Sequence, residues 1–115
     1  MMNKMVAFFA RKAPQIFRRS RYSGVKVVER VSDVPASTGA SIFVVERAGH
    51  HQWAVFDCPC RTGHRLTVSL RKDDHPHWTA EWRGKKVSFH PSLWLSGACR
   101  SHFWIRDNKV MWVPM

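Results

Sequence analysis

Residues 56–70, FDCPCRTGHRLTVSL, place two cysteines and a histidine directly before a strand pattern. The segment 65–71 alternates apolar and polar side chains, which is the period of a strand with one buried face. Pro59 separates Cys58 from Cys60, and in an extended segment two residues at this spacing project to the same side. The stretch therefore predicts two thiols that face one point close to the start of a strand.

Strand patterns also lie on both sides of this stretch. Segments rich in β-branched and aromatic residues occur at 25–31, 41–47, 52–57, 77–89 and 102–113. The last two are typical of hairpins, because Gly84 in one and Asp107 and Asn108 in the other tolerate the backbone angles of a tight turn. The sequence predicts a mostly β fold, a small single domain of about seven short strands.

The first 24 residues differ from the rest of the chain in charge. The 115 residues include 19 Lys and Arg against 8 Asp and Glu, a formal net charge of +11. Residues 1–24 contain no acidic side chain and carry Lys4, Arg11, Lys12, Arg18, Arg19 and Arg21. We expect a basic N-terminal tail or a short amphipathic helix here, suited to polyanions such as nucleic acid or to an acidic protein surface.

The cysteine count and the N-terminus indicate a cellular compartment. The chain has three cysteines, whereas a secreted disulfide scaffold usually has an even and denser set. The apolar run at 5–10 is shorter than a signal peptide requires and far below the roughly 20 residues of a membrane span. The sequence predicts a cytoplasmic protein without a transmembrane segment, in which clustered thiols more often bind metal than form disulfides.

A second cysteine-containing motif, GACRSHFW, completes a metal-ligand pattern. It places Cys99 and His102 two residues apart, a spacing that a tight turn converts into two ligands facing one point. Together with Cys58 and Cys60 they predict a tetrahedral zinc site of three thiolates and one imidazole. His64 is the alternative for the fourth position. We prefer His102, because each half of the site then supplies a pair.

A closed ligand set indicates a structural metal rather than an enzyme. With four protein ligands zinc has no open position for water, so its expected role is folding. A zinc-dependent hydrolase would need one ligand to be absent and Asp57 or His64 to act as general base. Ser101 beside His102 is explained by turn formation and does not indicate a nucleophile.

Several segments together resemble one bacterial family. FDCPCRTGHRLTVSL, HPHWTAEW, VSFHPSLW and GACRSHFWIRDNKVMW are similar, in this order, to a family of small CPC…CRSHF proteins, over roughly residues 40–112. The resemblance implies zinc binding at Cys58, Cys60, Cys99 and His102. It also implies genes beside ubiquitin-like modifiers and their E1-like, E2-like and JAB-peptidase partners.

The sequence departs from this family pattern after the second cysteine. Members often have a further cysteine where this chain has Thr62, and a glycine where it has Arg61. If that cysteine is a ligand in relatives, His64 becomes the better substitute for it.

These observations predict a basic segment at 1–24 and a zinc-binding, β-rich domain at 25–115. The predicted function is a zinc-stabilised accessory module of a bacterial ubiquitin-like conjugation system. It would contact a ubiquitin-like modifier or an E1-like or E2-like protein through a cationic, Trp-bearing surface. The alternatives are a nucleic-acid-binding zinc protein and a zinc-dependent hydrolase.

Overall fold

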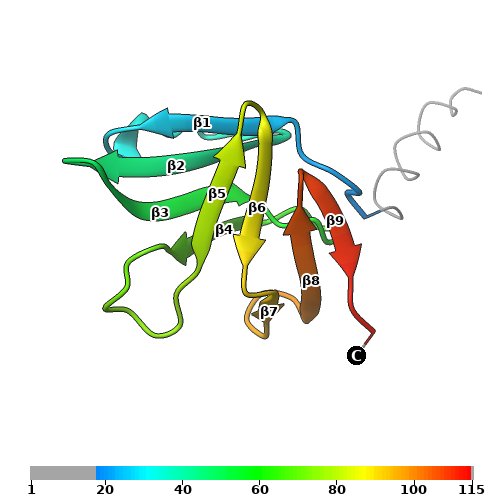
Figure 1. The fold of residues 1–115 in the computed structure, drawn as a ribbon. Coiled ribbons are helices and arrows are strands. Elements are labelled where there is room, and N and C mark those ends of the chain that lie inside the picture. Colours follow the sequence, from blue (N-terminus) through cyan, green and yellow to red (C-terminus); the bar gives the residue numbers. More distant parts are fainter. Residues whose placement is uncertain (1–17, 115) are drawn as a thin grey trace, which may run out of the picture.

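A computed structural model describes residues 18–114, which form nine β-strands and one short 3-10 helix (Figure 1). The elements are β1 (Gly24–Val28), η1 (Val31–Asp33), β2 (Ser41–Arg47), β3 (His50–Asp57), β4 (Arg65–Ser69), β5 (Thr79–Arg83), β6 (Lys86–His90), β7 (Leu93–Leu95), β8 (Ser101–Arg106) and β9 (Lys109–Trp112). The predicted mostly β fold is confirmed. Expectations for residues 1–17, including Lys4, Arg11 and Lys12, fall outside the described part. Among residues 18–114 no helix has the length and apolarity to cross a membrane.

The strands form three sheets. The first has the order β1-β2-β3-β4, the second is the β5–β6 hairpin, and the third has the order β7-β8-β9. All neighbours are antiparallel except β1 and β2, which pair in parallel through a connection that contains η1. The β5–β6 hairpin crosses the first sheet, and β6 lies beside β8 (Figure 1). This arrangement brings the end of β3 close to the start of β8.

The main hydrophobic core lies between the four-stranded sheet and the other two sheets. Its fully buried side chains come from β2, β3, β6, β7 and β8: Ile42, Val44, Ala54, Phe56, Val87, Leu93, Phe103 and Ile105. A smaller cluster of Val34, Phe43, Val45 and Val55 lies apart from it. Phe43 and Val45 alternate with Val44 along β2, so both faces of this central strand are buried, as a continuous apolar run predicts.

The two predicted tight turns are confirmed, and one of them also joins two sheets. Asp107 and Asn108 have φ angles of 48° and 72°, as the two-residue turn between β8 and β9 requires. The Asn108 side chain is buried. Its Oδ1 accepts a hydrogen bond from the Val87 amide and its Nδ2 donates to the Lys85 carbonyl, each at 2.8 Å. This amide therefore fixes the β5–β6 hairpin against the β8–β9 turn.

The last part of the predicted basic segment packs on the domain. The Arg19 amide donates to the Pro59 carbonyl, and the Val110 amide donates to the Ser20 carbonyl, both at 2.8 Å. Tyr22 is 1% exposed and its hydroxyl donates to the Asp57 carbonyl at 2.6 Å. Burial raises the pKa of this phenol, so it stays protonated as a donor. The segment thus links the cysteine loop to β9.

Replacing Tyr22 by alanine is expected to lower the free energy of unfolding by about 3–5 kcal/mol, the usual cost of removing a buried aromatic ring. The ring packs edge-on against Phe56, with centroids 5.6 Å apart. Tyr22→Phe keeps this contact and loses only the hydrogen bond, so it should cost about 1 kcal/mol. Urea unfolding followed by circular dichroism measures both. Equal midpoints for wild type and Tyr22→Ala would show that the segment contributes nothing to folding.

Candidate functional site

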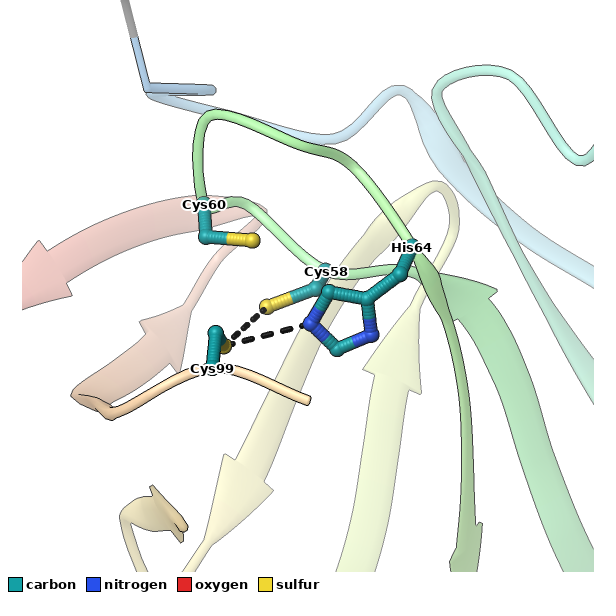
Figure 2. Close-up of side chains that lie close together, drawn as sticks. All are labelled: Cys58, Cys60, His64 and Cys99. Carbon is teal, nitrogen blue, oxygen red and sulfur yellow. Dashed lines mark hydrogen bonds between the residues drawn. The ribbon is translucent and has the colours of Figure 1, made fainter. Parts of the chain in front are cut away.

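The cysteine loop after β3 and the segment before β8 bring four metal-ligating side chains together (Figure 2). Cys58 and Cys60 follow β3, and His64 precedes β4. Because β3 and β4 pair up to Asp57 and Arg65, the two ends of the loop are held close, and the Cys58 amide donates to the His64 carbonyl at 2.7 Å. Cys99 lies in the connection between β7 and β8, two strands of the third sheet. The cluster therefore joins the first sheet to the third sheet, which is far from it in sequence.

The spacing of the donor atoms fits a tetrahedral metal. The sulfurs of Cys58 and Cys99 are 3.7 Å apart, and His64 Nε2 lies 3.2 Å from the sulfur of Cys99. The three sulfurs and a His64 ring nitrogen all lie within 4.8 Å of one another. A zinc ion bound at about 2.3 Å by sulfur places two sulfur ligands about 3.8 Å apart. All three cysteines are free thiols, so the donor set is available to a metal ion.

Hydrogen bonds next to the cluster favour the thiolate form of Cys60. Burial opposes ionisation of Cys60, but hydrogen bonds from the Thr62 hydroxyl and the Gly63 amide outweigh it and lower the pKa of this thiol to about 6. Burial raises the pKa of Cys58, so a metal ion would displace a proton there. The hydroxyl of Ser101 lies 3.2 Å from the sulfur of Cys99. Such outer contacts are typical of metal ligands.

His102 does not lie in this cluster. It belongs to β8, where Ser101, Phe103 and Ile105 face inward, so by strand alternation His102 faces the opposite side. The expected turn between Cys99 and His102 is replaced by the start of a strand. The structure therefore brings together Cys58, Cys60 and Cys99 as expected, and it places His64 in the fourth position instead of His102.

On the other side of β8, His102 forms a pair with Ser92. Ser92 Oγ and His102 Nε2 are hydrogen-bonded at 2.8 Å, and both residues are partly buried. Ser92 lies between β6 and β7, and its carbonyl accepts a hydrogen bond from Trp78 Nε1 at 3.2 Å. β7 pairs with β8 so that Trp94 stands opposite His102. A serine hydroxyl at this distance from an imidazole nitrogen can pass its proton to the ring and act as a nucleophile.

Trp94 covers the imidazole of His102. The two rings are stacked, with centroids 4.4 Å apart and planes 11° from parallel. Trp94 is nevertheless 67% exposed, more than any other large apolar residue identified in the described part. Among residues 18–114, no hydrogen bond joins His102 to an acidic side chain. The geometry is that of a serine–histidine pair whose imidazole is stacked on an aromatic ring.

Comparison with known protein families identifies one family for this chain. A family model described as bacterial ubiquitination-like system serine protease (BubE) matches residues 29–113. This chain belongs to the BubE family. No curated protein and no solved structure matches it significantly. The predicted link to a bacterial ubiquitination-like system is confirmed for the family, and the cysteine cluster and the Ser92–His102 pair of this chain both lie within the matched residues.

The sequence alone did not indicate Ser92 as a candidate. The serine considered there, Ser101, is 4% exposed and contacts the sulfur of Cys99. The signal available for Ser92 was its place in VSFHPSLW, one of the segments that carry the family resemblance. Asp57, a candidate base for a metal-bound water, instead accepts a hydrogen bond from the Thr38 hydroxyl at 2.8 Å. The zinc-dependent hydrolase gains no support from this geometry.

The basic residues of the predicted tail that the structure describes engage aromatic rings and backbone. The guanidinium of Arg18 lies 4.1 Å from the ring centre of Trp112, and that of Arg19 lies 5.3 Å from the ring centre of Tyr22. Arg21 forms a β-bridge with Lys109. These contacts give no support to nucleic-acid binding.

Proposed function

We propose that this chain is a serine peptidase of a bacterial ubiquitination-like system, with Ser92 as nucleophile and His102 as general base. The observation that carries the proposal is the 2.8 Å hydrogen bond between Ser92 Oγ and His102 Nε2. The description of the matched family as a serine protease supports it independently. The ubiquitin-like modifier, a partner that the sequence already predicted, becomes the substrate, either as a precursor or joined to a target.

The chemistry follows from the pair alone. Ser92 Oγ attacks the carbonyl carbon of the scissile bond while His102 Nε2 accepts the hydroxyl proton. The amide C–N bond then breaks, the proton passes from His102 to the departing amine, and an ester to Ser92 remains. Water attacks this ester with His102 again as the base, which releases the carboxylic acid and restores the serine. No oxidant or metal-bound water enters these steps.

Trp94 acts in this proposal as a positioning residue. Its indole restricts rotation of the His102 ring, which is the task of a carboxylate in a Ser-His-Asp triad. A stacked aromatic face also attracts the imidazolium that forms when the ring takes the proton. The stacking therefore favours both the orientation and the charged state that the reaction needs.

Trp94→Ala is expected to lower kcat by about tenfold, because the attraction between ring and imidazolium is lost. Trp94→Phe should retain most of the rate, since a phenyl ring can stack in the same place. Steady-state kinetics on a cleavable modifier fusion separates kcat from KM. An Ala variant that changes KM alone would show that Trp94 binds substrate and does not position His102.

The direct test of the proposal is covalent labelling. A fluorophosphonate reagent should modify one serine of the full-length protein, and peptide mass spectrometry should identify it as Ser92. Labelling should disappear in His102→Ala, because the hydroxyl is then no longer activated. Labelling of Ser101 instead of Ser92, or none in the folded wild type, would reject the assignment.

We further propose zinc as the ion held by Cys58, Cys60, His64 and Cys99. Three sulfurs and one imidazole are preferred ligands of zinc, and the donor spacing suits tetrahedral coordination. With four protein ligands the ion would supply folding energy and no reacting group. It would join the cysteine loop to Cys99. Cys99 lies two residues before β8, the strand that carries His102.

A further inference from the structure

A cavity lies beside His102, next to the end of β9 and the residues that follow it. It measures about 430 Å³ and is lined by Arg18, Arg100, His102, Trp112, Val113 and Pro114. The lining comes from the packed N-terminal segment, the residue before β8, and the end of β9. The amide of Val113 donates to the carbonyl of His102 at 2.9 Å, which holds Val113 next to the histidine.

Two arginines give this cavity its charge. The guanidinium of Arg18 is held 4.1 Å over the ring of Trp112, so its position is restrained. In the part of the chain that the structure describes, the ion pairs are Arg30 with Asp33 and His51 with Glu46. Neither Arg18 nor Arg100 therefore has an acidic partner there. Two guanidinium groups with free donors form a site for an anion, and their planar geometry suits a carboxylate.

We infer that this cavity binds a carboxylate of the substrate next to the scissile bond. The inference rests on the proposed peptidase function, because a chain cleaved by Ser92 must lie against His102, and His102 forms one wall of the cavity. The carboxylate comes either from an Asp or Glu side chain or from the free C-terminus of a short extension that is removed. Arg18 and Arg100 are then specificity-determining residues.

The competing explanation for these arginines is the metal cluster. Arg18 and Arg100 also line a smaller cavity that includes Cys60 and Cys99. Three thiolates and a divalent ion leave one negative charge, which a nearby guanidinium would attract. If this were the only role of Arg100, replacing it would change metal content or stability, and it would affect charged and neutral substrates equally.

The first experiment compares two serine reagents that differ by one carboxylate. The second-order rate of Ser92 modification is measured with para-(fluorosulfonyl)benzoate and with benzenesulfonyl fluoride, and the ratio of the two rates is compared between variants so that intrinsic reactivity cancels. Arg100→Gln should lower this ratio by roughly three- to tenfold, because a charge-assisted hydrogen bond is lost. The ratio for Arg100→Lys should lie between those of the wild type and Arg100→Gln. Added salt should reduce the ratio of the wild type, because it screens the charges.

Arg106→Gln is the matched control. It removes the same charge from the other end of β8, where the guanidinium lies 4.5 Å from the ring centre of Trp104 and outside this cavity. Its ratio should equal that of the wild type. An equal ratio in wild type and Arg100→Gln overturns the inference while Ser92 still reacts. Failure of both reagents to modify Ser92 overturns the proposed function as well.

The second experiment identifies the source of the carboxylate. Peptides from a bacterial proteome digest, with free or amidated C-termini, are treated with the wild type and cleavage sites are read by mass spectrometry. Preference for Asp or Glu at a fixed position indicates a side chain, and preference for free termini indicates the chain end. Arg100→Gln should lose whichever preference occurs. Cleavage without either preference overturns the inference and leaves the peptidase intact.

Discussion

Replacing Ser92 by alanine is expected to lower kcat/KM for peptide-bond cleavage by at least about a thousandfold, because Ser92 supplies the one hydroxyl hydrogen-bonded to the His102 ring among residues 18–114. His102→Ala should cause a loss of similar size. The double variant should be no worse than either single one, since the two side chains act as a unit. Cleavage of a fusion between the ubiquitin-like modifier of the same system and a reporter protein measures all three.

The folding of these variants separates chemistry from structure. Ser92 is partly buried just before β7, so loss of its hydroxyl should change the free energy of unfolding by no more than about 1 kcal/mol. Ser101→Ala is the matched control, because it removes a serine hydroxyl from the neighbouring strand on the core side. It should keep the activity. Full activity in Ser92→Ala, or its loss in Ser101→Ala with metal and fold intact, would contradict the assignment.

Replacing Cys99 by serine is expected to release the metal and lower the free energy of unfolding by about 3 kcal/mol or more. Cys99 is the proposed ligand that joins the third sheet to the loop between β3 and β4, and its sulfur contacts both Cys58 and His64. Structural zinc contributes directly to the free energy of folding, so the protein is less stable without it. Native mass spectrometry, with circular dichroism before and after a strong chelator, measures both quantities. Stoichiometric zinc in Cys99→Ser would show that the ligand set is different.

The two histidines provide a matched pair for this second prediction. His64→Ala should lose zinc, stability and activity together, because a missing ligand loosens the segment that leads into β8. His102→Ala should keep zinc and the fold but lose activity. Zinc retained in His64→Ala but lost in His102→Ala would show that His102 is the fourth ligand. The pair thus tests the metal assignment and the catalytic assignment in one experiment.

Much of the architecture was predictable because it depends on local patterns. The apolar run of β2 and the alternation of β4 match the observed strands, and the turn at Asp107 and Asn108 has the expected positive φ angles. β7 has only three residues, too few to show a period, and it was not predicted. The segment 25–31 was predicted as one strand, but β1 ends at Val28 and a 3-10 helix begins at Val31.

The sequence by itself determined the β class, the hairpins and the grouping of Cys58, Cys60 and Cys99, because strand period, turn residues and thiol chemistry are local properties. Only the tertiary structure decided where the two histidines lie. Whether a side chain faces the metal cluster or the opposite side depends on the residue at which a strand begins, and a shift of one residue reverses every side chain. β8 begins at Ser101, so His102 faces Ser92, and His64 remains to complete the cluster.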